Sequence, residues 1–85
     1  MDEASQLSEP LAIGPILLAE KFVLIGDYLQ LNPLVKSKLA HAKGLGLSLF
    51  QKLCQQHKMD VTVLKTQYRM CQDILDLSNS IVYNN

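Results

Sequence analysis

The sequence predicts an α/β fold in which a partial parallel sheet carries flanking helices. The run KFVLIG, residues 21–26, is almost wholly apolar and ends in glycine, as a strand buried on both faces of a parallel sheet does. A second run, DVTVLKTQ at residues 60–67, is rich in β-branched residues. Segments of helical periodicity alternate with these two runs, which is the order of elements typical of a parallel sheet. Polar residues that follow such strands lie at the sheet edge where ligands bind.

Composition limits what the chain can be. It has 85 residues, of which 48% are hydrophobic, and its eight basic and eight acidic residues give a formal net charge of zero. A chain of this length and composition predicts one small domain with a marginal core, and excludes a disordered tail or a strongly basic nucleic-acid binder. No apolar run reaches membrane-spanning length, so we expect no membrane partner. The two cysteines, Cys54 and Cys71, predict free, buried thiols rather than a disulfide framework or a metal site.

The elements of the first half follow from local signals. Ser8 is a plausible N-cap with Pro10 in the first turn, and Gly14-Pro15 predicts an interruption that leaves two short helical pieces. The predicted strand at residues 21–26 comes next. From residue 27 to residue 46 the periodic pattern fails, which predicts a long loop.

The second half alternates helix, strand and helix. LSLFQKLCQQH, residues 47–57, repeats apolar residues at spacings of three and four and predicts an amphipathic helix. The predicted strand at residues 60–67 follows. The last helix, residues 71–83, places one apolar stripe on one face, so we expect that face to be buried; the stripe consists of Ile74, Leu75, Leu77, Ser78, Ile81 and Val82.

Three groups of polar residues stand out against this pattern. Asp2 and Glu3 open the chain, Gln30 follows the first predicted strand, and Arg69 follows the second. Each has an ordinary explanation on its own: a solvated terminal charge, a turn, and an arginine that extends over a helix. Together they bring paired carboxylates, an amide and a guanidinium to strand ends, and these are the groups that phosphoryl transfer needs.

The same residues carry a resemblance to a known family. DEAS at residues 2–5 resembles helicase motif II, GDYLQL at 26–31 resembles motif III, and QYRM at 67–70 resembles motif IV. The chain therefore resembles part of a superfamily-one helicase motor of the Upf-like branch, and within it is most similar to the eukaryotic DNA replication ATP-dependent helicase/nucleases. The resemblance implies a partial RecA-like sheet of a P-loop NTPase. It also implies that residues 1–85 are a partial ATPase domain from motif II to motif IV, truncated at both ends.

The resemblance also implies a role for each site residue. Asp2 would hold Mg²⁺, and Glu3 would position or deprotonate the attacking water. Gln30 would donate a hydrogen bond to the terminal phosphate of ATP. Arg69 would reach that phosphate as an arginine finger, and Tyr68 would stack on the adenine.

What the resemblance implies for a parent protein is wider than this chain. The parent would be an ATP-dependent DNA helicase with nuclease activity, acting in DNA replication and repair and coupling ATP hydrolysis to translocation on single-stranded DNA. Its cofactors would be ATP, Mg²⁺ and an iron-sulfur cluster whose ligands are not in this chain. Its partners would be single-stranded or flap DNA and the remaining motor domains of the same polypeptide, in the nucleus and, as a second compartment, the mitochondrion.

Two departures and two alternatives stand beside this interpretation. The 85 residues contain no Gly-rich loop ending in Gly-Lys-Ser/Thr, so we expect the isolated chain neither to hydrolyse ATP nor to unwind DNA. Tyr28 and Asn32 stand where the family often has histidine and proline.

The first alternative function is that of a fragment of an Upf-like RNA helicase. The second is a non-catalytic interaction module derived from the motor.

Overall fold

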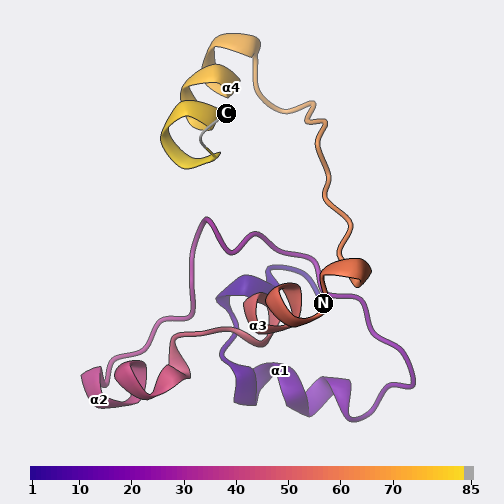
Figure 1. Cartoon of the computed structure of the whole chain (residues 1–85), viewed down its shortest axis with the longest axis vertical. Coiled ribbons are helices and arrows are strands. Elements are labelled where there is room, and N and C mark those ends of the chain that lie inside the picture. Colours follow the sequence, from indigo (N-terminus) through magenta and orange to yellow (C-terminus); the bar gives the residue numbers. More distant parts are fainter. Residues whose placement is uncertain (84–85) are drawn as a thin grey trace.

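The computed structural model describes residues 1–83, which form short helices joined by extended segments (Figure 1). The α-helices are α1 (Glu9–Ile16), α2 (Lys38–Ala40), α3 (Leu49–Gln56) and α4 (Gln72–Ser78). Shorter turns of 3₁₀ or π type are η1 (Ala4–Gln6), η2 (His41–Leu45), η3 (Lys58–Asp60) and η4 (Asn79–Tyr83). In the described residues there is no β-strand, only an isolated antiparallel bridge between Ser8 and Ser48.

The predicted α/β fold, a partial RecA-like parallel sheet with flanking helices, is therefore wrong for this structure. Residues 21–26 and 60–67 have the composition of strands, but they do not pair with each other, and a strand exists only where a neighbour completes its hydrogen bonds. Residues 1–4 form a few backbone hydrogen bonds with residues 23–25. The Met1 amino group donates to Val23 O at 3.0 Å, and Ile25 N donates to Met1 O at 2.9 Å. This contact is too short to be a strand.

Helix α1 begins at the predicted N-cap, Ser8, with Pro10 in its first turn. The predicted break at Gly14-Pro15 is wrong, because one continuous helix runs through both residues. Pro15 lacks the N–H that would bond one turn back, yet it sits next to the last residue of α1, so little helix remains for it to disrupt.

Helix α3 confirms the amphipathic helix predicted for residues 47–57. The buried Ser48 caps it by accepting a hydrogen bond from Gln51 N at 3.1 Å. Helices α1 and α3 pack together, and Lys52 Nζ lies 2.5 Å from Glu9 Oε2 across their contact. The most deeply buried side chains gather here and are small: Ala4, Ser5, Ala12 and Ser48.

The predicted loop at residues 27–46 is confirmed only in its first part. Residues 31–37 are irregular, but α2 and η2 follow. Ser37 caps α2 by accepting a hydrogen bond from Ala40 N at 3.2 Å, a signal the loop prediction overlooked. Gly44, with φ of 102°, interrupts the helical backbone of η2.

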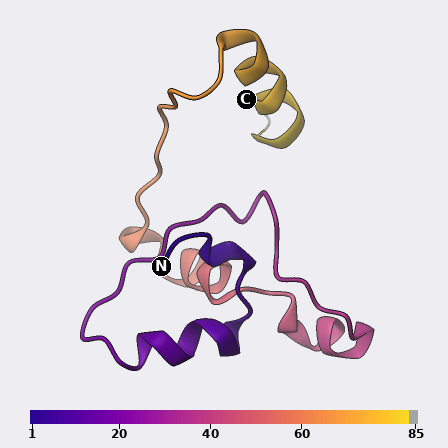
Figure 2. The ribbon, with the colours of Figure 1, turned by 180° about the vertical axis from the view of Figure 1, so that it is seen from behind.

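The last predicted helix is confirmed as α4 and η4, but its predicted buried face is wrong. Ile74, Leu77 and Ile81 are 54%, 60% and 70% exposed. The reason is position, because α4 stands apart from α1 and α3 at the end of a drawn-out segment in both views (Figures 1 and 2). Both cysteines are free as predicted. Cys71 is exposed, however, and Cys54 only half-buried, so their predicted burial is wrong. No helix in residues 1–83 is long and apolar enough to cross a membrane.

Candidate functional site

The two carboxylates at the start of the chain lie on a segment held against residues 23–27. Ala4 N donates to Ile25 O at 2.9 Å, and the buried Ser5 Oγ accepts from Asp27 N at 3.4 Å. Gly26 permits this approach, because a Cβ there would lie 2.9 Å from Ser5 N. The sequence that resembles motif II therefore bonds through its backbone to Ile25, and through the Ser5 hydroxyl to Asp27 of the sequence that resembles motif III.

Asp2 and Glu3 themselves are exposed at this corner. Glu3 has a left-handed backbone with φ of 50°, which is uncommon for a residue with a side chain and is often found at functional sites. Asp2 Oδ1 accepts from Glu3 N at 2.8 Å, and Glu3 Oε2 accepts from Gln6 Nε2 at 3.1 Å. Each carboxylate therefore has one oxygen hydrogen-bonded within the chain and keeps acceptor capacity toward solvent.

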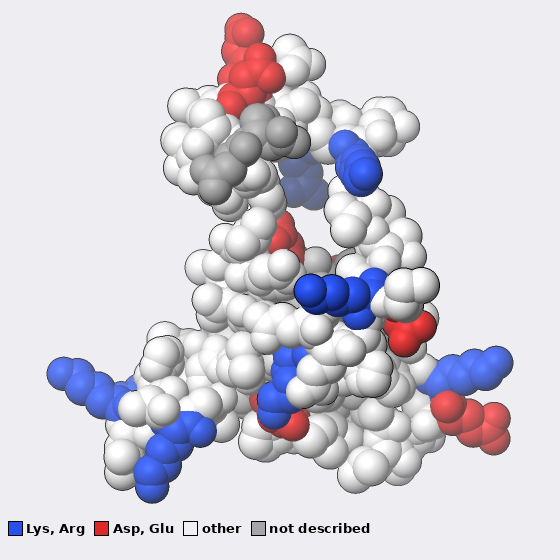
Figure 3. All heavy atoms as spheres, viewed as in Figure 1, with Lys and Arg blue, Asp and Glu red and all other residues white. Residues whose placement is uncertain are grey.

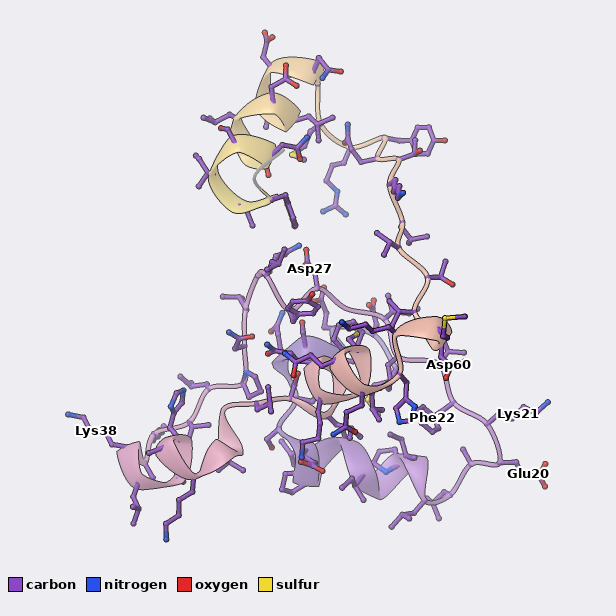
Figure 4. The ribbon with its side chains drawn as sticks, in the orientation of Figure 1. Glu20, Lys21, Phe22, Asp27, Lys38 and Asp60 are labelled. Atoms are coloured by element: carbon purple, nitrogen blue, oxygen red, sulfur yellow. The ribbon has the colours of Figure 1, made fainter. Side chains whose placement is uncertain are left out.

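Gln30 belongs to a three-residue hydrogen-bond network. Its Nε2 donates to Asp27 Oδ2 at 2.8 Å and to the Tyr83 hydroxyl oxygen at 3.2 Å. The Tyr83 hydroxyl in turn donates a short hydrogen bond to the same Asp27 oxygen. Figure 4 shows Asp27 on the part of the loop that faces the C-terminal helical segment. The network therefore joins the sequence that resembles motif III to η4.

The network shifts the pKa values of both ionisable members. Partial burial acts to raise the pKa of the Asp27 carboxyl, but its three hydrogen bonds together outweigh burial and hold the pKa below the ordinary value. The pKa of Tyr83 is raised, first because its hydroxyl donates to the Asp27 carboxylate and then because of partial burial. Both shifts favour the arrangement of a charged carboxylate beside a protonated phenol.

Tyr68 and Arg69 lie on a turn closed by the side chain of Gln67. Gln67 Oε1 accepts from Met70 N at 2.7 Å, and Gln67 Nε2 donates to Met70 O at 2.9 Å. This double hydrogen bond bridges the two residues between them and leaves their side chains outside, where Tyr68 is 95% exposed and Arg69 is also exposed. The predicted sheet edge does not hold the arginine; the Gln67 amide does.

The structure does not gather all the predicted site residues. No hydrogen bond or ion pair in residues 1–83 joins Glu3, Gln30 and Arg69. Two hollows, of about 290 and 740 Å³, are lined by other residues around α1 and η2. The assignment of Asp2, Glu3, Gln30, Tyr68 and Arg69 therefore remains a prediction.

The sequence interpretation missed the two partners of Gln30. Asp27 stands three positions before Gln30, a spacing at which side chains within one turn meet, so this pairing had a local signal. Tyr83 is 53 residues from Gln30 and had none.

Charges on the described surface are mixed. Residues 28–59 contain five lysines and no acidic residue. On the face in Figure 3, basic side chains project from the corner that α2 occupies and from other places, with acidic side chains between them. That face offers no continuous basic track for a nucleic-acid backbone.

Comparison with known proteins points to one family. One AAA domain model matches residues 1–38 and a second matches residues 45–85. The chain is 52% identical over 83 residues to the DNA replication ATP-dependent helicase/nuclease of Schizosaccharomyces pombe and 49% identical over 83 residues to that of Arabidopsis thaliana. It is 47% identical over 83 residues to the human protein of that description. Each match covers 98% of this chain, which spans only 6% to 8% of the length of these relatives.

Proposed function

Because the chain belongs to the family of DNA replication ATP-dependent helicase/nucleases, we propose that it supplies part of the ATP-hydrolysing motor of such an enzyme. The observation that carries this proposal is near half identity over 98% of the chain, which includes all three helicase-like sequences. The motor would couple ATP hydrolysis to movement along single-stranded DNA during DNA replication and repair.

The two exposed carboxylates would act at the reacting phosphate. Gln6 orients the Glu3 carboxylate through one oxygen, and the other oxygen can accept a proton from an attacking water. Asp2 would hold Mg²⁺, because this ion is usually bound by one or two carboxylates together with substrate phosphates. When bound, Mg²⁺ neutralises phosphate charge. The exposed carboxylate of Asp2 fits that requirement.

Neutral and cationic groups would complete the nucleotide contacts. Gln30 would donate an N–H to the terminal phosphate, and Arg69 would neutralise charge that develops on it. Tyr68 would stack on the adenine through its exposed ring. The turn closed by Gln67 supports this assignment, since it presents both side chains on the same outward loop.

An iron-sulfur cluster does not fit the residues of this chain. Such a cluster takes four cysteine ligands or a mixture of cysteine and histidine, whereas the chain has two cysteines, and residues 1–83 contain no group of three or more potential ligands. We derive no step through a cluster. If the parent protein carries one, residues elsewhere in it would supply the ligands.

The test is a segment exchange. The 85 residues replace the matching segment of the Schizosaccharomyces pombe relative, and ATP hydrolysis is measured with DNA, with RNA and without nucleic acid. We expect DNA-stimulated hydrolysis in the chimera. Glu3→Gln and Arg69→Ala should each reduce kcat by about a thousandfold or more, the scale on which an arginine finger acts.

A matched control keeps loss of folding separate from loss of chemistry. Glu20→Gln removes an exposed carboxylate that projects outward at the edge of the molecule (Figure 4), and it should leave kcat unchanged. Hydrolysis that survives Glu3→Gln would refute the assigned roles. Stimulation by RNA but not DNA would instead support the RNA helicase alternative. A folded chimera without hydrolysis would support the interaction module.

We further propose that single-stranded or flap DNA and the other motor segments of the same polypeptide are the partners of this chain. The compartment would be the nucleus, with the mitochondrion second. A fluorescent fusion of the longer protein tests the location, and signal confined to the bulk cytoplasm would contradict it.

A further inference from the structure

The nitrogen of the Gln30 amide faces two acceptors on the side of η4. Gln30 Nε2 donates to Asp27 Oδ2 at 2.8 Å and to the Tyr83 hydroxyl oxygen at 3.2 Å. Tyr83 also donates to Asp27, so the three side chains form a closed ring of hydrogen bonds. Phosphate oxygens of ATP can only accept, so a phosphate oxygen that approaches the amide from the side of η4 competes with these two acceptors.

Tyr83 is the partner that can leave. Asp27 belongs to the same turn as Gln30 and also accepts Leu29 N at 3.0 Å, so its position is fixed locally. Tyr83 comes from η4, and its bond with the amide is the longer of the two. Movement of η4 would take the Tyr83 acceptor away from the Gln30 amide while Asp27 kept the amide oriented.

The same contacts hold the C-terminal helical segment in place. In the part of the chain that the structure describes, every hydrogen bond between residues 72–83 and residues 1–60 goes to Asp27 or Gln30. The connection between the two parts, residues 61–71, is extended and largely exposed (Figure 1). The hydrogen bond between Tyr83 and the Gln30 amide therefore exists only while η4 is docked.

We propose that Tyr83 is a positioning residue that withholds the Gln30 amide from nucleotide while η4 is docked, and that Asp27 keeps the amide oriented when η4 leaves. This rests on the phosphate contact proposed for Gln30. By thermodynamic linkage, a phosphate that engages Gln30 loosens η4, and undocked η4 makes the amide available. The segment after motif IV thus controls a residue of motif III.

The first test measures the amide directly in the 85-residue chain. Side-chain ¹⁵N–¹H signals of Gln30 are assigned by their absence in Gln30→Ala. Tyr83→Phe keeps the ring and removes the hydroxyl, so it should shift these signals and speed their hydrogen exchange about two- to tenfold, the factor that one net hydrogen bond is worth. Tyr28→Phe is the matched control, since Tyr28 contacts Phe50 only through its ring and its hydroxyl has no hydrogen bond in residues 1–83.

A second variant covers the case in which Tyr83→Phe disturbs folding. Asp27→Asn retains the shape of the side chain and should lower the pKa of Tyr83, measured from its ring carbon signals. Unchanged Gln30 signals in Tyr83→Phe, or an unchanged Tyr83 pKa in Asp27→Asn, would overturn the positioning role.

The nucleotide test uses the segment-exchange chimera. Tyr83→Phe should lower the KM for ATP about two- to tenfold with kcat unchanged, whereas Tyr28→Phe should change neither. If Gln30→Ala raises KM but Tyr83→Phe has no effect, the withholding is refuted while the phosphate role of Gln30 stands. If Gln30→Ala also leaves the KM for ATP unchanged, Gln30 has no role in phosphate binding, and Tyr83 cannot withhold it from nucleotide. The side-chain ¹⁵N–¹H signals then still show whether Tyr83 positions Gln30.

Discussion

The contact between the motif II-like and motif III-like sequences depends on the absence of a side chain at Gly26. A Cβ at this position would lie 2.9 Å from Ser5 N, 3.2 Å from Ala4 N and 3.3 Å from Ser5 Oγ. Two of these neighbours are backbone atoms, which cannot rotate away as a flexible side chain can. Gly26→Ala must therefore move residues 4–5 away from residues 25–27.

The expected cost follows from overpacking. Forcing one extra methyl into a closed contact costs about 1–3 kcal/mol, and the displacement also strains the hydrogen bonds from Ala4 N to Ile25 O and from Asp27 N to Ser5 Oγ. Since the deeply buried side chains are few and small, this is a large share of any stability the chain has. Exchange of the Ala4 amide hydrogen should accelerate about 5- to 150-fold.

Gly14→Ala is the matched control for Gly26→Ala. Gly14 lies inside α1, where a Cβ would point into open space, so alanine should stabilise the chain by about 0.5–1 kcal/mol in urea unfolding. A shift of stability in the same direction in both variants, or unchanged exchange of the Ala4 amide hydrogen in Gly26→Ala, would contradict a close approach of Gly26 to residues 4–5.

Three further results are expected. Ser48→Ala removes the buried N-cap of α3 and should cost about 1 kcal/mol, read from helical circular dichroism during unfolding; no loss would mean that the cap is dispensable. Gln67→Ala opens the turn closed on Met70 and should raise backbone mobility at residues 68–69 in ¹⁵N relaxation, while unchanged relaxation would contradict the clamp. Docking of η4 should weaken at both acidic and alkaline pH. The pKa of Asp27 is lowered, so its contribution is present above its ordinary value of 3.8 and is lost as pH falls through the folded value. The pKa of Tyr83 is raised, so its contribution is present below 10.0 and is lost as pH rises through the folded value. Side-chain amide signals of Gln30 that stay unchanged from acid to alkaline pH would refute this.

Local signals predicted the helices better than the strands. The predicted N-cap position Ser8 is confirmed as the start of α1, although its side chain makes no capping hydrogen bond, and the periodic apolar residues of residues 47–57 predicted α3, because both signals need only neighbours along the chain. Residues 21–26 and 60–67 were predicted as strands from composition alone, but strand formation needs a partner at the right distance, and the chain does not bring these two segments together.

The candidate site divides in the same way. The comparisons confirm the family resemblance of the short sequences that contain the predicted site residues, and the roles of these residues stay predictions; they are Asp2, Glu3, Gln30, Tyr68 and Arg69. The contacts that hold these residues in place were not predictable from the sequence. The approach of residues 4–5 to Gly26 and the double hydrogen bond from Gln67 to Met70 both depend on distances between atoms in the folded chain.

The order of residues alone determined the family of this chain and the chemical groups it can bring to a nucleotide, because short motifs and amino-acid types are properties of the linear sequence. Tertiary structure alone decided that Tyr83, 53 positions away, shares the amide of Gln30. Hydrogen bonds act over about 3 Å in space whatever the separation along the chain, so only the folded path of the backbone could bring these two residues together.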